Sequence, residues 1–556
     1  MSQGKFTFRK HTSVGAAAAE DDRSFLSTCF VDTGDISPLL EPNDPRRLIL
    51  GRTGTGKSAI IQHLSERQDS IELDPQTLAF NYVTNSTVLQ FFLAAGVKLD
   101  LFFRLLWRHA FTVELLKFKY DIQSEEQSRT VLSRLWALVA QDKNKERALK
   151  YIQNWGPKFW ENTEVRLQEL THRVEEDLKG SIGARIPATE MNASAAAKLS
   201  DEERSEIIQR GQNIINAIQM KELTNVLRFL AEDVFNDDRS RVYVFVDHLD
   251  EHWVEDQFRY LLIRSLIETV RDFFQVKNVK IIVVLRSDLL EQVFRRTRDS
   301  GFQEEKYRSL YLILRWTKSQ LIDLLDRRIN HLVRQTYVKA PVTHKDLLTF
   351  KVSKQLAIDY MLSRTSMRPR ELIEFFNCCI ECADGKATIT KSILFSAEGR
   401  YSKYRLRSLQ DEWISEYPGL IEFAHILRGR RPQFCLSEID KEQVTELCLS
   451  YAVEYFGRTD HLSISARSAA ESGAQTPEFL RVLFHAFYRT GIVGLRTAST
   501  ERAQWSFAEE SGVLASTIDE GTRAYIHPMY FRALGTASRG DGSEEREATQ
   551  ERGDPA

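Results

Sequence analysis

The chain has 556 residues, a length that predicts two to four domains at roughly 150 residues each. Hydrophobic residues make up 42% of it and charged residues 28%, which predicts a globular protein with real cores. The formal net charge of -2 excludes an overall field that steers the chain to nucleic acid. We find no run of about 18 apolar residues and no signal-peptide core, so we expect no membrane span and a cytoplasmic location.

The two ends of the chain carry little pattern. Residues 1–20 are polar and alanine-rich, and residues 535–556 have no apolar period, so we expect both ends to be disordered. Between them, the run RRLIL at 46–50 predicts a short buried strand. The sequence GRTGTGKSAIIQHL then continues this strand through a glycine loop into a helix.

Two further runs, VYVFVD at 242–247 and KIIVVLR at 280–286, are apolar on both faces and rich in β-branched residues. Such runs are typical of central strands in a parallel sheet. Because helical sequence separates the strands, we predict an α/β fold with a doubly wound parallel-sheet core at 21–340.

The segment between the first helix and the strand at 242 is far longer than one crossover needs. Its period is mostly helical, which predicts a large helical insertion at about 90–235. The aromatic-rich part at 88–120 is expected to pack on the core. The charged part from 141 is interpreted as protruding helices, with a solvated excursion favoured over a partner-binding arm.

The strongest motif is GRTGTGKS, a full G-x-x-x-x-G-K-S phosphate-binding loop between strand and helix. Its glycines let backbone N–H groups point into one cavity, and the helix N-terminus adds its dipole. Lys57 is expected to reach the β- and γ-phosphates of a nucleotide, and Ser58 to ligate Mg²⁺. A structural glycine turn is the alternative. The predicted nucleotide-binding residues here are Gly51, Thr53, Gly54, Thr55, Gly56, Lys57, Ser58 and Ala59.

A second motif is the apolar strand that ends in Asp247 and is followed by Asp250 and Glu251. An acid at the carboxyl end of a strand beside the loop is typical of Walker B, so Asp247 is predicted to hold the metal. Asp250 or Glu251 would orient or deprotonate the attacking water, with Asp250 slightly preferred. We expect at least one of the two to cap the following helix instead.

Three arginines are candidates for contacting the nucleotide. Arg286, at the end of the third strand, is predicted to contact the γ-phosphate, and a structural salt bridge to Asp288 or Asp247 is the alternative. Arg368 and Arg370 open a helix with a proline at its start, and either could read the nucleotide from a lid. A solvated helix start is the alternative for both.

Beyond the core we expect a helical lid at 341–395, a basic linker region at 396–436 and a further domain at 437–534. The stretch 401–431 is the most basic and is the first place to look for nucleic acid. Its cations are Lys403, Arg405, Arg407, Arg428, Arg430 and Arg431.

With these motifs, residues 30–383 resemble the STAND, NACHT and KAP group of AAA+-related P-loop ATPases. The sequence DHLDE at 247–251 is similar to the group's D-G-L-D-E and D-D-L-D-R forms, although His248 stands where ordinary AAA+ proteins have Glu. Arg286 resembles the sensor arginine of the fourth core strand. Arg368 and Arg370 resemble the sensor-2 arginines of an origin-recognition-type lid. The resemblance implies ATP and Mg²⁺ as ligands, slow ATP hydrolysis and self-association into a homo-oligomer.

The sequence GRTGTGKSAIIQHL also resembles a set of little-described bacterial P-loop ATPases, several of which lie in anti-phage defence or stress loci. Farther on, FLRVLFHAFYRTGIVGL and AYIHPMYFRAL resemble a winged helix, with the helix at 477–488 in the recognition position. Residues 441–535 carry nine Lys and Arg against eleven Asp and Glu, so an intramolecular or protein-binding role is favoured over DNA binding.

The leading expectation is an ATP-controlled switch whose lid closes over the nucleotide and regulates a protein partner in a bacterial defence or stress system. A DNA-binding AAA+ ATPase of origin-recognition type, acting as a loader or motor, is the alternative. A third hypothesis is a scaffold or sensor in which the nucleotide is mainly a structural ligand.

Overall fold

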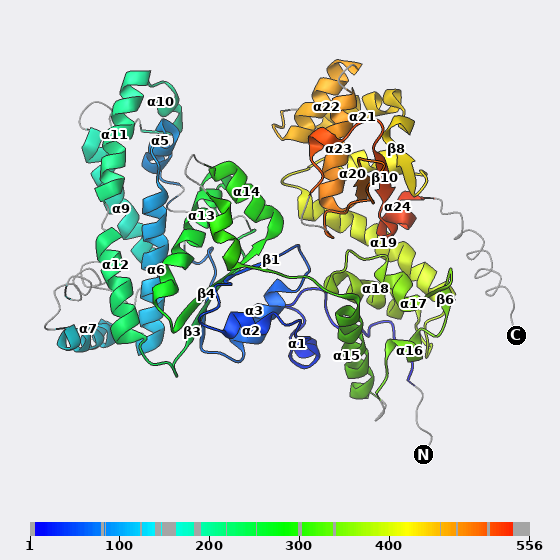
Figure 1. The fold of residues 1–556 in the computed structure, drawn as a ribbon, viewed down its shortest axis with the longest axis horizontal. Coiled ribbons are helices and arrows are strands. Elements are labelled where there is room, and N and C mark those ends of the chain that lie inside the picture. Colours follow the sequence, from blue (N-terminus) through cyan, green and yellow to red (C-terminus); the bar gives the residue numbers. More distant parts are fainter. Residues whose placement is uncertain are drawn as a thin grey trace, which may run out of the picture. The chain divides into compact units, whose positions relative to one another are not determined.

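The structure is a computed structural model, and it divides the chain into two compact units (Figure 1). We call Asp32–Arg52 with Lys57–Leu314 the sheet unit, and Met1–Val31, Thr53–Gly56 and Arg315–Ala556 the C-terminal unit. The residues that the structure describes are 6–78, 83, 85–122, 125–139, 146, 163–182, 191–217, 220–251, 253–298, 303–336, 341–455, 457–473, 476–508 and 512–536. None of the described helices is long and apolar enough to cross a membrane.

The sheet unit is built on a five-stranded sheet with the order β2-β3-β4-β1-β5, in which every neighbouring pair is parallel. Strands β1 and β3 are buried throughout, and so is β4 up to its last residue, because both faces are covered. The α/β prediction is confirmed, as are the three predicted strands. The strands are β1 (Leu48–Gly51), β2 (Ser70–Leu73), β3 (Val242–Val246), β4 (Val279–Arg286) and β5 (Tyr311–Ile313).

The connections of this sheet define a topological switch point. From β1 the chain passes through α3 (Lys57–Ser65) to β2, whereas from β4 it passes through α14 (Ser287–Thr297) to β5, on the other side of β1. Since β1 and β4 are neighbours whose connections leave in opposite directions, the sheet has a switch point between them. Ligands of open α/β sheets bind outside the carboxyl ends of the strands at such a point.

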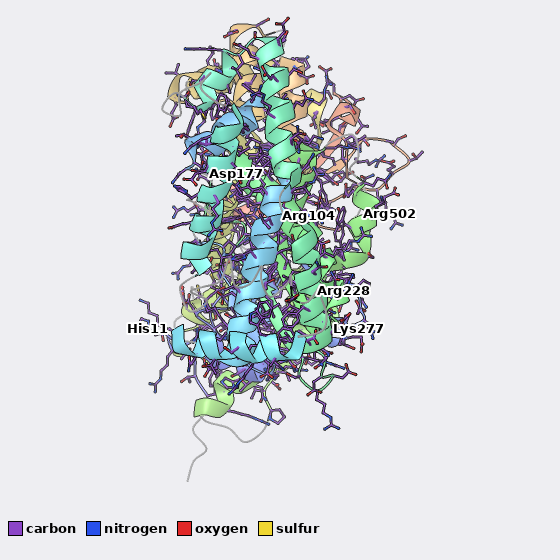
Figure 2. The ribbon with its side chains drawn as sticks, turned by 90° about the vertical axis from the view of Figure 1, so that its left-hand side faces the viewer. His11, Arg104, Asp177, Arg228, Lys277 and Arg502 are labelled. Carbon is purple, nitrogen blue, oxygen red and sulfur yellow. The ribbon has the colours of Figure 1, made fainter. Side chains whose placement is uncertain are left out.

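The predicted insertion is helical where it is described. The long helices of this insertion lie alongside one another (Figures 1 and 2); they are α6 (Asp100–Tyr120), α9 (Thr163–Ile182), α11 (Asp201–Ala217) and α12 (Met220–Phe229). As predicted, the aromatic part packs on the core: the Trp107 indole of α6 donates to the Leu262 carbonyl of α13 at 2.9 Å, and Phe103 meets Phe258 edge to face. Residues 141–145, 147–162 and 183–190 of the charged segment lie outside the described residues.

The remaining helices of the sheet unit are α2 (Ile36–Leu40), α5 (Thr87–Ala95), α7 (Glu125–Val139), α10 (Ala193–Ala197), the π-helical turn Leu230–Val234, α13 (Asp256–Asp272) and the 3₁₀ turns Phe273–Gln275 and Glu304–Leu310. Helix α5 shows how such helices are bounded. The Ser86 side chain accepts from the Leu89 N–H at its start, and Gly96 ends it in the left-handed conformation.

The N-terminal residues are part of the C-terminal unit, so the prediction of disorder at 1–20 is wrong for residues 6–20. Phe8 and Val14 are fully buried in its core. The Val14 N–H donates to the Asn377 side chain at 2.9 Å, and Arg328 forms a buried ion pair with Asp22. Burial of two apolar side chains and contacts with Asn377 and Arg328, both more than 300 positions away, order these residues despite their polar composition. Residues 1–5 and 537–556 lie outside the described residues.

A helical layer forms the next part of the C-terminal unit. Helix α18 packs on α19, where the rings of Phe375 and Tyr401 stack 4.5 Å apart. Residues 396–413, which were predicted as part of a basic linker region, continue helix α19, and one side of that helix is buried. The elements are α1 (Arg23–Cys29), α15 (Lys318–Thr336), α16 (His344–Leu347), β6 (Lys351–Val352), β7 (Gln355–Leu356), α17 (Ala357–Leu362), α18 (Pro369–Cys382) and α19 (Lys391–Trp413).

The chain ends in a three-stranded antiparallel sheet, ordered β8-β10-β9, with helices packed around it. The helix predicted at 477–488 is present as α23, and most of its side chains are buried. The elements are α20 (Leu420–Ala424), the 3₁₀ turn His425–Leu427, β8 (Gln433–Cys435), the 3₁₀ turn Leu436–Glu438, α21 (Lys441–Glu454), α22 (His461–Glu471), α23 (Thr476–Thr490), β9 (Val493–Arg496), the 3₁₀ turn Ala515–Thr517, β10 (Arg523–Ile526), the 3₁₀ turn Pro528–Tyr530 and α24 (Phe531–Leu534).

One buried lysine ties the segment before β1 to the sheet. The ammonium of Lys280 on β4 donates to the carbonyl oxygens of Pro38 at 2.7 Å, Glu41 at 2.7 Å and Asp44 at 3.2 Å. We expect Lys280→Met to lower the free energy of unfolding by about 2–4 kcal/mol, since methionine leaves these carbonyls without their donor. Urea denaturation of both proteins measures this loss.

The exposed Lys277 offers a matched control for that substitution, because it precedes the same strand. Lys277→Met should change the unfolding free energy by no more than about 0.5 kcal/mol. Equal stabilities of the two variants would show that Lys280 does not hold the segment in place.

Candidate functional site

The glycine loop follows β1 and precedes α3, as the sequence predicts. Gly54 and Gly56 have φ angles of 78° and 94°, in the left-handed region that favours glycine. A Cβ atom on Gly54 would lie 2.9 Å from the Cβ of Arg370, so this position also needs glycine for space. The loop conformation thus depends on glycine at two of its positions.

Within the sheet unit, the loop is fastened by its own lysine. The ammonium of Lys57 donates to the carbonyl oxygens of Gly51 at 3.2 Å and Arg52 at 3.0 Å. Burial lowers the pKa of Lys57 to about 8, although the charges of Asp250 and Asp247 oppose that shift. Lys57 therefore lies within electrostatic reach of both carboxylates.

Within the C-terminal unit, the carbonyls of residues 53–55 accept hydrogen bonds from three donors of its own. Arg368 Nη1 donates to Thr53 at 3.0 Å, the Arg370 N–H to Gly54 at 3.4 Å, and the Trp316 indole to Thr55 at 2.8 Å. A trans peptide directs its N–H away from its C=O. The N–H groups that follow these carbonyls consequently point away from the donors, as an anion cradle requires.

Ser58 and Asp247 lie together in the sheet unit. The Ser58 hydroxyl donates to Asp247 Oδ2 at 3.2 Å, although 189 positions separate the two residues. Burial raises the pKa of Asp247, while hydrogen bonds from the His248 N–H and Ser58 work in the opposite direction. A hydroxyl and a carboxylate fit Mg²⁺, which takes few protein ligands and keeps waters and phosphate oxygens. Among the described residues no group of three or more His, Cys, Asp or Glu could hold a metal.

The two predicted water-activating acids lie in different surroundings. Glu251 accepts from Gln76 Nε2 at 2.5 Å, and its other oxygen lies 2.9 Å from His248 Nδ1. Burial alone would lower the pKa of His248, but Asp247 and Glu251 outweigh burial and raise it. Glu251 is thus occupied by two neighbours, whereas the charge of Asp250 acts on Lys57. This difference favours Asp250 over Glu251 as the candidate for the predicted water-activating acid.

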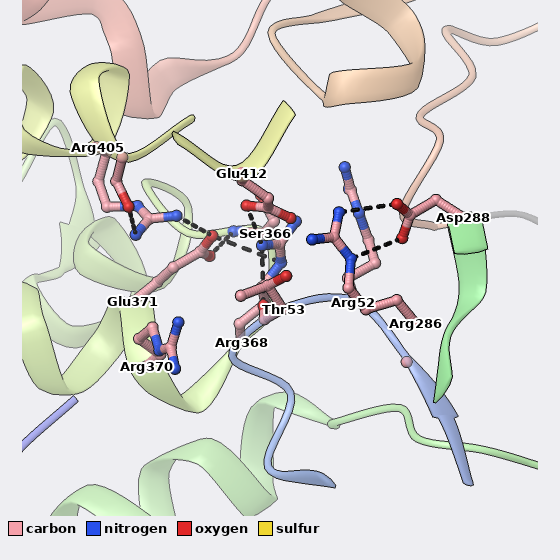
Figure 3. Close-up of polar contacts among 12 residues, drawn as sticks. Arg52, Thr53, Arg286, Asp288, Ser366, Arg368, Arg370, Glu371, Arg405 and Glu412 are labelled. Atoms are coloured by element: carbon pink, nitrogen blue, oxygen red, sulfur yellow. Dashed lines mark hydrogen bonds and ion pairs between the residues drawn. The ribbon is translucent and has the colours of Figure 1, made fainter. Parts of the chain in front are cut away.

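Arg286 forms the ion pair that was the alternative to a phosphate contact. Its Nε and Nη2 donate to the two carboxylate oxygens of Asp288 at 3.1 and 2.8 Å (Figure 3). The parallel register of β1 and β4 pairs Arg286 with Gly51, the first residue of the loop. Arg286 therefore lies level with the start of the loop.

The two arginines predicted to act from a lid contact residues 53 and 54 within the C-terminal unit. Arg368 is buried and lies 3.4 Å from a carboxylate oxygen of Glu412 and 3.6 Å from one of Glu371 (Figure 3). Arg370 Nε donates to the Ala17 carbonyl at 3.0 Å. Neither is a solvated helix start.

Several partners of the site were not predicted from the sequence. Gln76 follows the edge strand β2 and reaches Glu251 because β2 lies beside β3. Trp316 contacts the Thr55 carbonyl within the C-terminal unit. Of the cations predicted for nucleic acid, Arg405 is buried against Glu371, and Arg430 donates to the Ile426 carbonyl at 2.7 Å. The side chains of these two arginines therefore make contacts within the protein.

Comparison with known proteins shows similarity to a family model and to a bacterial protein. Residues 319–410 match the family model described as the FunZ-associated C-terminal helical domain. This range contains both lid arginines and most of the helical layer. Over 544 residues the chain is 22% identical to a protein of Escherichia coli (strain K12) named "Putative transposon gamma-delta 80.3 kDa protein". That alignment covers 94% of this chain and 67% of the relative.

Arg368 should be a large contributor to the stability of the C-terminal unit. We expect Arg368→Met to cost about 3–5 kcal/mol, because it leaves the buried carboxylates of Glu371 and Glu412 without that cation. Thermal or urea unfolding measures the loss. Arg400→Met removes an exposed pair with Glu381 and should cost less than about 1 kcal/mol. A loss no larger for Arg368→Met than for Arg400→Met would contradict the assigned role.

Proposed function

We propose that the chain binds ATP with Mg²⁺ through residues 51–58 and hydrolyses it slowly. The observation that carries the proposal is the hydrogen bond between Ser58, the last residue of the loop, and Asp247, which follows β3. A hydroxyl and a carboxylate, both suitable Mg²⁺ ligands, lie together although 189 positions separate them in the sequence. They lie beside a glycine loop that leads into a helix. A structural glycine turn would require no such carboxylate.

Each residue of the site has a proposed role. Lys57 binds the β- and γ-phosphates, and the N–H groups of the loop hold the remaining phosphate oxygens. Ser58 and Asp247 would hold Mg²⁺, which would neutralise negative charge on the phosphates. Asp250 orients the attacking water and accepts its proton. Arg286 contacts the third phosphate.

We further propose that ATP acts as the input of a switch of the STAND or AAA+ type. Arg368 and Arg370 contact the loop tip, and both lie in the range matched by the FunZ-associated domain. A nucleotide bound by the N–H groups of the loop would shift the peptide groups whose carbonyls accept from these two arginines. The end of the chain, with its antiparallel sheet and helix α23, is proposed to be a winged helix that transmits this change to a protein partner.

The proposed setting is a bacterial defence or stress system, in which the chain self-associates and regulates an effector. The name of the Escherichia coli relative adds a transposon as a second setting for such a switch. A protein-directed role agrees with α23, most of whose side chains are buried, so that little of its surface is left to read a DNA groove.

Replacement of the loop lysine tests the proposal. Lys57→Ala should weaken ATP binding by at least about 100-fold and abolish phosphate release, because it removes the cation that holds the transferred phosphate. Isothermal titration and a phosphate-release assay measure the two effects. Lys277→Ala is the control and should bind ATP normally. Biological output that survives in Lys57→Ala despite lost binding would refute the switch.

The lowered pKa of Lys57 predicts how binding depends on pH. Phosphate favours the protonated lysine, but above pH 8 the free protein holds it neutral, so binding must take up a proton. Affinity for ATP in EDTA, without metal, should therefore fall about tenfold from pH 7 to pH 9. Titrations at several pH values measure the slope.

Lys57→Arg provides the comparison for this pH dependence, since a guanidinium stays charged over the whole range. A variant that binds ATP with a flat profile would support the assignment. The same slope in both proteins would show that another group titrates.

A further inference from the structure

The ion pair between Arg286 and Asp288 lies at the phosphate end of the proposed site. Both side chains are 16% exposed, and the contact is bidentate, with parallel N–H···O bonds at 3.1 and 2.8 Å. Arg286 is level with Gly51 in the sheet, and Asp288 is in the first turn of α14. Figure 3 shows the two planar groups facing each other.

The charges around Lys57 show what this pair does to the site. Asp250, Asp247 and Asp288 favour a charged Lys57, and Arg286 opposes it. Asp288 therefore holds the one arginine of this group while adding a third negative charge. A third phosphate entering here would meet three carboxylates and an arginine that is already paired.

We propose that Asp288 is a latch that makes the site respond to the third phosphate of a nucleoside triphosphate. Asp288 keeps Arg286 while no γ-phosphate is present, and a γ-phosphate takes Arg286 from it. A diphosphate ends short of Arg286 and leaves the pair closed. This inference rests on the proposed function, because it assumes that residues 51–58 bind the nucleotide.

The latch gives the protein a physical means of separating ATP from ADP. Opening a partly buried bidentate pair costs free energy, and only a ligand that offers Arg286 an equivalent partner recovers it. ATP binding is then coupled to release of Asp288 at the start of α14. ADP binding does not open the ion pair, so it neither costs that free energy nor releases Asp288.

A structural role for Asp288 is the competing explanation. An acid in the first turn of a helix is stabilised by the helix dipole whether or not an arginine is near. That role predicts that Asp288 substitutions change the stability of the fold but not the preference between nucleotides. Binding measurements therefore distinguish the two explanations.

The test compares Mg²⁺ complexes of the non-hydrolysable ATP analogue AMP-PNP and of ADP by isothermal titration. In Asp288→Asn, affinity for AMP-PNP should rise about tenfold and affinity for ADP less than about threefold, since only the triphosphate must open the pair. Asp288→Ser is a second variant that keeps a side-chain oxygen at the helix start. Thermal unfolding of each variant establishes that it is folded.

Two matched controls isolate the latch from general electrostatics. Asp256→Asn also removes a negative charge of the sheet unit, but from an ion pair with Arg259 outside the proposed site, so it should leave the ratio of AMP-PNP to ADP affinity unchanged. In the Arg286→Ala background, Asp288→Asn should no longer favour AMP-PNP, because the arginine to be released is absent.

Each result decides the matter. A selective gain for AMP-PNP that depends on Arg286 supports the latch. Equal gains for the two nucleotides, or a loss of AMP-PNP affinity, overturn the latch and leave the proposed function standing. Failure of the wild-type protein to bind either nucleotide refutes the proposed function and the latch with it.

Discussion

A parallel sheet brings the carboxyl ends of its strands to one edge, and the candidate site depends on that constraint. Strand β4 separates β1 from β3, yet the Ser58 hydroxyl still reaches Asp247 at 3.2 Å. Arg286 ends the strand between them and is level with the first residue of the loop. The lysine, the hydroxyl, the carboxylate and the arginine therefore converge because the strands run in the same direction.

The conformation of the loop depends on hydrogen bonds from other residues as well as on its own glycines. Its carbonyls at residues 51 and 52 accept from Lys57 in the sheet unit, while those at 53–55 accept from Arg368, Arg370 and Trp316 in the C-terminal unit. Arg368 in turn depends on buried acids of α18 and α19. The tip of the loop is thus bonded to groups that belong to the helical layer.

The sequence was sufficient to predict the features with a local pattern. Three strands with unbroken apolar runs, the glycine loop and helix α23 lie where the periodicity places them. It failed where long-range contacts decide the structure. Residues 6–20 are polar on average, but Phe8 and Val14 enter a core made by residues more than 300 positions away. The basic composition at 396–413 concealed a helix whose Arg405 is neutralised by Glu371 and Glu374.

The same limit applies to the acids that follow β3. The sequence left open whether Asp250 or Glu251 serves the water, because two neighbouring carboxylates look alike in one dimension. The residue that distinguishes the two acids is Gln76, which donates to Glu251. Gln76 follows β2, the strand that pairs with β3. The spacing of residues 247–251 carries no information about Gln76, which follows the edge strand β2.

His248 explains the unusual residue after Asp247 in physical terms. Its φ angle of 61° is left-handed, a conformation that favours Gly and is tolerated by Asp, Asn and His more readily than by other residues. The D-G-L-D-E and D-D-L-D-R forms, which this segment resembles, place Gly or Asp at the same point. A Glu would be strained here. The backbone turn after β3 therefore favours a residue other than Glu directly after Asp247, and the next carboxylates along the chain are those of Asp250 and Glu251.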